Sequence, residues 1–113
     1  MKQSEIWLIN LDPTIGAEIK KTRPAIIVND NALGKLPLKI IVPITDWKDK
    51  YQMAVWMVKL IPSKVNGLSK DSAADCFQVR SLSEDRFVKK IGQVNFNTLE
   101  DLKEALKKVL SIY

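Results

Sequence analysis

The residues best suited to chemistry in this sequence lie in one short basic segment. Gly16 is followed by the carboxylate of Glu18 and then by three cations, Lys20, Lys21 and Arg23. The planar guanidinium of Arg23 matches the geometry of a phosphate, and the two lysines supply point charges for neighbouring phosphates of a polynucleotide. The segment therefore suits an oxyanion such as a nucleic-acid backbone. The alternative is a solvated basic loop without a ligand, because short basic clusters are common.

Two further segments carry polar side chains where strands are expected to present them. Thr45 ends a β-branched run, so its hydroxyl lies where the chain leaves a strand, although a threonine there is often a turn or cap residue. In the run Asp75–Arg80, strand alternation directs Gln78 and Arg80 to the same side. An ordinary half-buried strand is the alternative for this second pattern.

The composition argues against a metal-binding, disulfide-bonded or membrane protein. The chain has no histidine and one cysteine, Cys76, so we expect no internal disulfide, no metal site and no cofactor. The longest apolar stretches fall well short of the roughly 20 residues that span a bilayer, and no signal region is visible, which predicts a cytoplasmic protein without a membrane partner. The net charge of +5 favours an anionic partner if the excess is clustered, and is otherwise typical of a solubilising surface.

The hydrophobic pattern predicts a β-rich chain. Alternation indicates a strand over Glu5–Leu11, and Asp12–Arg23, which has no apolar period, is predicted to be a long functional loop. The other expected elements are two central strands at Pro24–Val28 and Leu38–Ile44, a strand buried on both faces at Met53–Leu60, a strand at Ala73–Leu82, a helical turn at Ser83–Arg86 and a short strand at Val88–Val94.

The C-terminal segment predicts a helix. Apolar residues recur at helical spacing over Thr98–Ile112, and Asn97 with Glu100 predicts a capping box at its start. Residues 1–113 are therefore expected to form one domain of mainly β (α+β) class. The expected architecture is a small curled SH3-like barrel with a C-terminal helix.

Taken in order, these segments resemble the MazF/PemK family of toxin endoribonucleases from type II toxin-antitoxin systems. The resemblance covers nearly the whole chain. The matching motifs are Glu5-Ile6-Trp7, Leu11-Asp12-Pro13-Thr14, Gly16-Ala17-Glu18, Arg23-Pro24-Ala25-Ile26-Ile27-Val28, Pro43-Ile44-Thr45, Gly67-Leu68, Lys70-Asp71-Ser72, Gln78-Val79-Arg80, Arg86 and Gly92.

The resemblance implies a MazF/CcdB-like homodimer that binds single-stranded RNA across its dimer face. It also implies metal-independent cleavage, in which a ribose 2′-hydroxyl attacks the adjacent phosphate and leaves a 2′,3′-cyclic phosphate and a 5′-hydroxyl, with Arg23 and Thr45 as the catalytic pair. An arginine, with a pKa above about 12, is a poor base, so Arg23 is expected to stabilise developing charge. Because the chain lacks histidine, Glu18 is the candidate base.

The remaining expectations concern binding. RNA contacts are predicted for Gly16, Lys20, Lys21, Gln78 and Arg80, and the resemblance implies a cognate antitoxin whose disordered acidic tail covers the RNA groove. Two other classes stay open: a non-catalytic SH3-like module that binds nucleic acid or a peptide, and a gyrase-poisoning toxin of the same fold. The catalytic pair distinguishes them, because a binding module needs no such pair.

Overall fold

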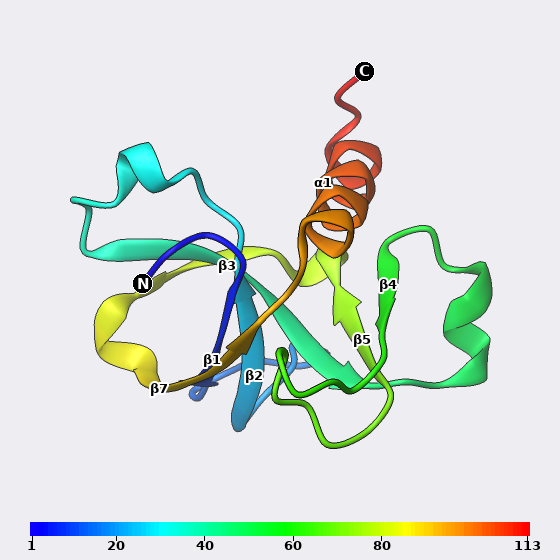
Figure 1. Cartoon of the computed structure of the whole chain (residues 1–113), viewed down its shortest axis with the longest axis horizontal. Helices are drawn as coiled ribbons and strands as arrows, with labels where there is room; N and C mark the ends of the chain where they lie inside the picture. Colours follow the sequence, from blue (N-terminus) through cyan, green and yellow to red (C-terminus); the bar gives the residue numbers. More distant parts are fainter.

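The β-branched and alternating runs form one antiparallel sheet, and the apolar stripe at the C-terminus forms the α-helix (Figure 1). The computed structural model describes residues 1–113. The strands are β1 (Glu5–Asn10), β2 (Thr22–Ile27), β3 (Leu38–Asp46), β4 (Met57–Leu60), β5 (Ser72–Asp75), β6 (Arg80–Ser83) and β7 (Phe87–Gln93), and the helix is α1 (Phe96–Leu110). The connections contain four 3₁₀ helices, η1 (Asn31–Leu33), η2 (Asp49–Met53), η3 (Cys76–Gln78) and η4 (Glu84–Arg86).

The long strand β3 organises the sheet, whose order is β4-β5-β3-β2-β1-β7 with β6 paired to β3. Its first part pairs with β2 and β6, whereas its last residues, from Ile44 to Asp46, pair with β5. The sheet therefore bends along β3. In the strand order, β4 and β7 are the two end strands. The expected mainly β fold with a C-terminal helix is confirmed, although the curled sheet is open and not a closed barrel.

Alternate residues of the central strands point to opposite faces of the sheet and build two hydrophobic clusters. The helix-side cluster includes Ile6, Ile26 and Val42, which pack with Leu99 and Leu102 of α1. The loop-side cluster consists of Ile9, Leu11, Ala25, Ile27, Ile41 and Leu82, with Ile19 packed against it. The loop-side cluster therefore supports the segment that the sequence marks as functional.

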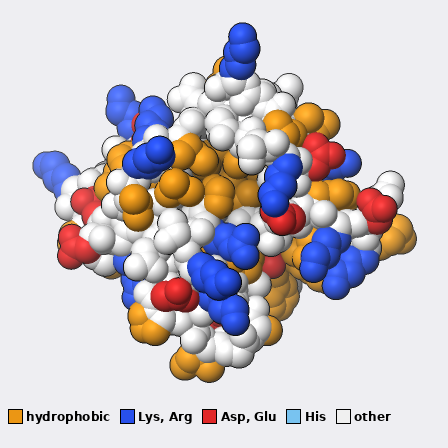
Figure 2. All heavy atoms as spheres, turned by 90° about the horizontal axis from the view of Figure 1, so that it is seen from below, with side chains coloured by type: hydrophobic (Ala, Val, Ile, Leu, Met, Phe, Trp, Pro, Cys, Tyr) orange, Lys and Arg blue, Asp and Glu red, His pale blue; other side chains and the backbone are white.

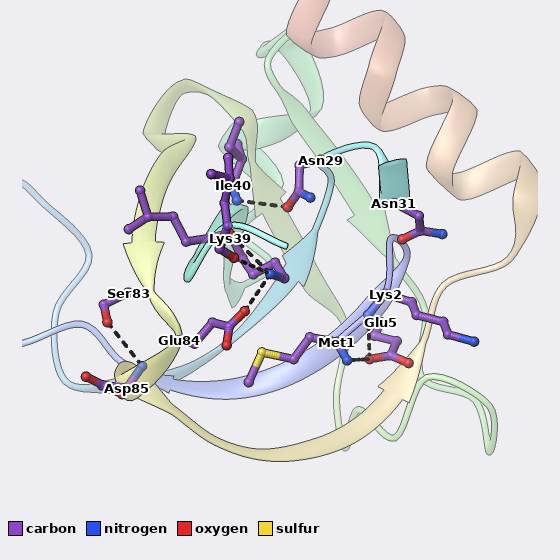
Figure 3. Close-up of polar contacts among 12 residues, drawn as sticks. Met1, Lys2, Glu5, Asn29, Asn31, Lys39, Ile40, Ser83, Glu84 and Asp85 are labelled. Carbon is purple, nitrogen blue, oxygen red and sulfur yellow. Dashed lines mark hydrogen bonds and ion pairs between the residues drawn. The ribbon is translucent and has the colours of Figure 1, made fainter. Parts of the chain in front are cut away.

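An ion pair with a buried lysine lies beside the loop-side cluster (Figure 3). Lys39 pairs with Leu82 across β3 and β6, and its side chain is only 2% exposed. Its Nζ donates to Glu84 Oε1 at 2.6 Å and to the Leu36 carbonyl at 3.2 Å. An ammonium group needs such partners when it leaves water. The pair joins β3 to η4 and thereby fixes the place where β7 begins.

Two predicted strands differ from the structure. Over the predicted strand Met53–Leu60, only Met57–Leu60 is a strand, and Met53, which ends η2, is 88% exposed. An apolar run indicates burial only if another element covers it, and none covers Met53. The predicted strand Ala73–Leu82 is broken by η3, because the Asp75 side chain accepts a hydrogen bond from the backbone nitrogen of Phe77 and turns the chain.

Element boundaries differ at two further places. The helix begins at Phe96, and Thr98 N donates to Asn95 Oδ1 at 2.8 Å, so Asn95 is the cap and the predicted capping box at Asn97 is wrong. The long loop ends at Lys21, because the next two residues already pair with β1. The central position of the strands predicted at 24–28 and 38–44 is confirmed by the sheet order. The helix of this structure is too short and too polar to cross a membrane.

Candidate functional site

Arg23 and Thr45 meet at the ends of two neighbouring central strands. β2 and β3 pair with Ala25 opposite Pro43, so the same antiparallel register, carried two residues further, brings Arg23 opposite Thr45. The pairing of β3 with β2 ends at Pro43, and on its other edge β3 pairs with β5, where Thr45 lies opposite Ala73. Arg23 and Thr45 line one pocket of about 210 Å³, which we call the small pocket.

The small pocket offers several polar groups. Arg23 is half-buried, and its Nε donates to the carbonyl of Lys20 at 3.4 Å, so the Nη groups of its guanidinium are available to a ligand. Lys70 also lines the pocket, where its Nζ pairs with Asp46 Oδ2 at 3.0 Å. The guanidinium and the Thr45 hydroxyl therefore provide hydrogen-bond donors suited to an oxyanion.

The loop from Leu11 to Lys21 is closed at its stem by hydrogen bonds. Leu11 N donates to the carbonyl of Lys21 at 3.0 Å, and Lys21 N donates to Asp12 Oδ1 at 3.0 Å. Arg86 Nη1 donates to the carbonyls of Asn10 and Asp12, at 3.2 Å and 2.7 Å. The backbone of Lys21 has a φ of 71°, in the left-handed region that a lysine seldom adopts. These contacts hold the loop ends firmly, and the tip projects from the sheet.

A larger pocket lies beneath this loop. It has a volume of about 530 Å³, and we call it the large pocket; its lining residues are Leu11, Ala17, Glu18, Ile19, Pro43, Phe77, Gln78, Val79 and Arg80. One wall comes from the loop, and the opposite wall comes from η3 and the start of β6. Pro43 lines the large pocket and Thr45 the small one, two residues apart on the same face of β3, so the two pockets follow one another along that strand.

The structure separates the predicted site residues into two groups. Arg23 and Thr45 share the small pocket, whereas Glu18, Gln78 and Arg80 line the large one. The Glu18 carboxylate accepts a hydrogen bond from Ile15 N within the loop. The candidate base is thus placed beside the expected RNA-binding residues and not in the pocket that Arg23 and Thr45 line.

The remaining predicted residues lie on the loop itself. Gly16, Lys20 and Lys21 are exposed, and Gly16 has a φ of 59° that favours glycine at the turn. On the face seen from below Figure 1, Lys and Arg side chains, with Asp and Glu side chains among them, border an apolar band (Figure 2). Basic and apolar surface together suit a polyanion that also carries flat apolar groups, such as single-stranded nucleic acid.

No group of three or more His, Cys, Asp or Glu side chains is placed to hold a metal ion. Cys76 is fully buried, and burial together with the charge of Asp75 raises the pKa of its thiol to about 12. A thiol in that state is a poor nucleophile. Cys76 is therefore a core residue, and the chemistry of the site falls to the other groups.

Sequence reasoning missed the residues that hold the site in place. The sequence places Gln78 among the RNA contacts but does not indicate that its amide bonds to Asp75 and to the backbone of Ile19. Arg86 belonged only to the family motifs, and the structure shows it as the clamp of the loop stem. An aspartate that accepts from a backbone nitrogen two residues later is a common turn signal, so the Asp75 turn was open to prediction.

Known proteins share this sequence pattern. A family model for the PemK-like, MazF-like toxin of type II toxin-antitoxin systems matches residues 2–110. Endoribonuclease MazF9 of Mycobacterium tuberculosis is 32% identical over 120 residues, which cover 100% of this chain and 98% of that protein. Endoribonuclease EndoA of Bacillus subtilis is 23% identical over 113 residues, covering 99% of this chain and 96% of that protein.

Solved structures share the fold. MazF from Deinococcus radiodurans has a TM-score of 0.83 at 21% identity, over 99% of this chain and 97% of that chain. An endoribonuclease from a mycobacterial species, solved in complex with its cognate antitoxin, has a TM-score of 0.79 at 18% identity, over 100% of this chain and 97% of that chain. With the family model matched over nearly the whole sequence, this chain belongs to the PemK-like, MazF-like toxins of type II toxin-antitoxin systems.

Proposed function

We propose that this chain is the toxin endoribonuclease of its toxin-antitoxin system, and that it cuts single-stranded RNA at the small pocket. The observation that carries the proposal is that Arg23 and Thr45, near the adjacent ends of β2 and β3, line one pocket. A module that only binds needs no such pair. The names of the relatives, which are endoribonucleases, support the same conclusion.

The proposed reaction is an internal transfer within the RNA. The 2′-hydroxyl loses its proton, its oxygen bonds to the adjacent phosphorus, the bond from phosphorus to the 5′-oxygen breaks, and that oxygen takes up a proton. Negative charge grows on the non-bridging oxygens, where the Nη groups of Arg23 and the hydroxyl of Thr45 would donate hydrogen bonds. No metal ion is required, because the attacking group already lies beside the phosphorus.

The two proton transfers need a base and a proton donor. Glu18 is the base expected from the sequence, but it lines the large pocket and would reach the 2′-hydroxyl only if the loop moved, so in this arrangement we do not assign it the base role. A water molecule or the guanidinium of Arg23 would then supply the proton to the leaving oxygen.

The RNA path follows from the two pockets. With the scissile phosphate at Arg23 and Thr45, neighbouring nucleotides extend along β3 to the large pocket, where Arg80 offers another cation. The exposed Lys20 and Lys21 lie on the loop between the pockets and would contact flanking phosphates.

The proposed partners are RNA, a second copy of the chain and an antitoxin. Two structural neighbours are a MazE-MazF complex from Deinococcus radiodurans and the mycobacterial complex with a cognate antitoxin. For this chain we propose a homodimer in the cytoplasm, and an antitoxin whose acidic, disordered tail covers the basic loop. Such a tail gains charge-assisted contacts but loses conformational entropy, so its affinity should fall as salt rises.

The test is to incubate the purified chain with a long RNA in EDTA and to map the cut sites and end groups. Cyclic phosphates and 5′-hydroxyls are expected. A DNA of the same sequence, and an RNA with 2′-methoxy at the cut site, should bind but stay intact. Cutting of the 2′-methoxy RNA would overturn the mechanism, and an intact RNA with stable binding would make the chain a binding module.

A further inference from the structure

The side-chain amide of Gln78 connects the two walls of the large pocket. Ile19 N, in the loop, donates to Gln78 Oε1 at 2.7 Å across 59 residues of sequence. The same amide donates through Nε2 to Asp75 Oδ2 at 3.2 Å. A half-buried side chain on η3 thus links the backbone of the loop to a buried carboxylate.

These two contacts fix the orientation of the Gln78 amide. If the amide were turned over, its NH₂ group would face the N–H of Ile19, and its oxygen would face the carboxylate of Asp75. Both contacts would then be repulsive, so only one orientation satisfies the two partners. Each bond of the amide therefore supports the other.

Asp75 is the fixed end of this chain of contacts. The residue is only 6% exposed, its Oδ1 accepts from Phe77 N at 3.1 Å, and its backbone pairs with Met57 of β4. Burial raises the pKa of Asp75, while the hydrogen bonds from Phe77 and Gln78 act in the opposite direction. Those bonds therefore favour the ionised carboxylate, which accepts from both donors at once.

The middle of the loop has few other ties to the body. The bonds that Leu11, Lys21 and Arg86 make all lie at its stem. Between them, the side chain of Ile19 packs on the loop-side cluster, and the Gln78 amide supplies the hydrogen bond that joins this part of the loop to η3.

We propose that Asp75 and Gln78 position the loop over the large pocket and so determine which RNA sequences are cut. The inference rests on the proposed ribonuclease function. Gln78 is then a positioning residue for the loop, and not primarily an RNA contact. Because Ala17, Glu18 and Ile19 form one wall and Phe77 and Val79 the other, the bond from Ile19 to Gln78 sets the width available to a nucleobase.

An exchange of the two side-chain types tests the proposal. In Gln78→Glu, two carboxylates face one another, and in Asp75→Asn, two NH₂ groups do. In the double variant, the new amide at position 75 can still accept from Phe77 N and donate to the new carboxylate at position 78, whose other oxygen accepts from Ile19 N. The double variant thus restores every bond and keeps the net charge, which makes the set a double-mutant cycle.

Two measurements are needed. Amide hydrogen exchange at Ile19 reports the bond without RNA, and cleavage of a randomised RNA pool reports the sequence preference. Each single variant should speed exchange at Ile19 roughly five- to tenfold, the equivalent of one hydrogen bond, and broaden the preference. The double variant should restore both. Ser83→Ala, which removes the equivalent side-chain cap of η4, is the matched control and should change neither.

The outcomes separate the two proposals. If the single variants leave exchange at Ile19 unchanged, the positioning role is wrong. If exchange rises while the cleavage pattern stays the same, the loop does not set the preference. If the wild-type chain cuts no RNA, the proposed function fails, and the exchange measurement still decides whether Asp75 and Gln78 hold the loop.

Discussion

The small and the large pocket differ in what holds their residues in place. Arg23 and Thr45 lie on β2 and β3, where backbone pairing with neighbouring strands fixes both positions. The large pocket has one wall on a loop that depends on the amide of Gln78. A rigid sheet suits a reaction that needs groups placed to within a fraction of an ångström, whereas a loop can change without loss of the fold. Under the proposed function, the strands therefore hold the groups that perform the chemistry, and the loop sets the sequence preference.

The largest effect is expected at the small pocket. Arg23→Ala and Thr45→Ala should each lower the single-turnover cleavage rate roughly 10²- to 10³-fold, since each removes a donor to the transition state. The unfolding midpoint should stay within roughly 5 °C of the wild type, because both residues lie at strand ends. Lys35→Ala, at an exposed residue, is the control. A variant that cuts at the wild-type rate would remove that residue from the catalytic pair.

A substitution of Glu18 tests whether the large pocket takes part in catalysis or only in RNA binding. A general base contributes roughly 10²- to 10⁴-fold to a rate, so Glu18→Gln should cause a loss of that size if the loop carries the base into the small pocket. From its position in the large pocket we expect less than a roughly tenfold change in kcat and a larger change in KM. Single-turnover rates at saturating RNA measure this, and a loss of the size expected for a general base would contradict the division.

The central strands were predictable because their signal is local. The runs at 24–28 and 38–44 are rich in β-branched residues, and such runs favour buried strands wherever they occur. The meeting of Arg23 and Thr45 was implied by family resemblance alone. The physical cause is the register that pairs Ala25 with Pro43. That register is a property of the sheet and cannot be predicted from either strand sequence alone.

The predictions fail where contacts with distant parts of the chain determine the burial or the hydrogen bonding of a residue. The apolar run at 53–60 resembles a core strand, yet Met53 is exposed because no element packs on it. The partner of Gln78 lies 59 residues away, so no local pattern indicates that its amide is already engaged. Residues that hold a site therefore escape sequence reasoning more easily than residues that perform its chemistry.

A smaller effect is expected for the lysines of the loop. Lys20→Gln and Lys21→Asn should weaken RNA binding and lower the slope of log affinity against log salt by roughly 0.7 for each phosphate that is no longer neutralised. Asparagine is chosen at position 21 because it tolerates the left-handed backbone there. Binding titrations at several salt concentrations measure the slope. An unchanged slope in both variants would place the RNA away from this part of the loop.

The smallest effect on cleavage is expected at Glu5, which lines neither pocket and lies beside Met1 and Lys2 (Figure 3). Burial pushes the pKa of Glu5 upward, but hydrogen bonds from Trp7, Lys2 and Lys90, together with the charge of the amino terminus, outweigh it and lower the pKa to about 2. The ionised carboxylate is thus favoured by folding.

A folded-state pKa below the ordinary value of 4.5 means that Glu5 stabilises the protein above pH 4.5 and loses that contribution as the pH falls towards 2. Asp75 acts in the opposite sense, because its pKa is raised. The difference in unfolding free energy between wild type and Glu5→Gln isolates the first effect: it should be largest at neutral pH and shrink on acidification. Urea titrations at pH 7, 4 and 3 measure it, and cleavage at pH 7 should be unchanged. A difference independent of pH would show that Glu5 acts through packing, whereas a loss of cleavage at pH 7 would show that the sheet transmits the change to the small pocket.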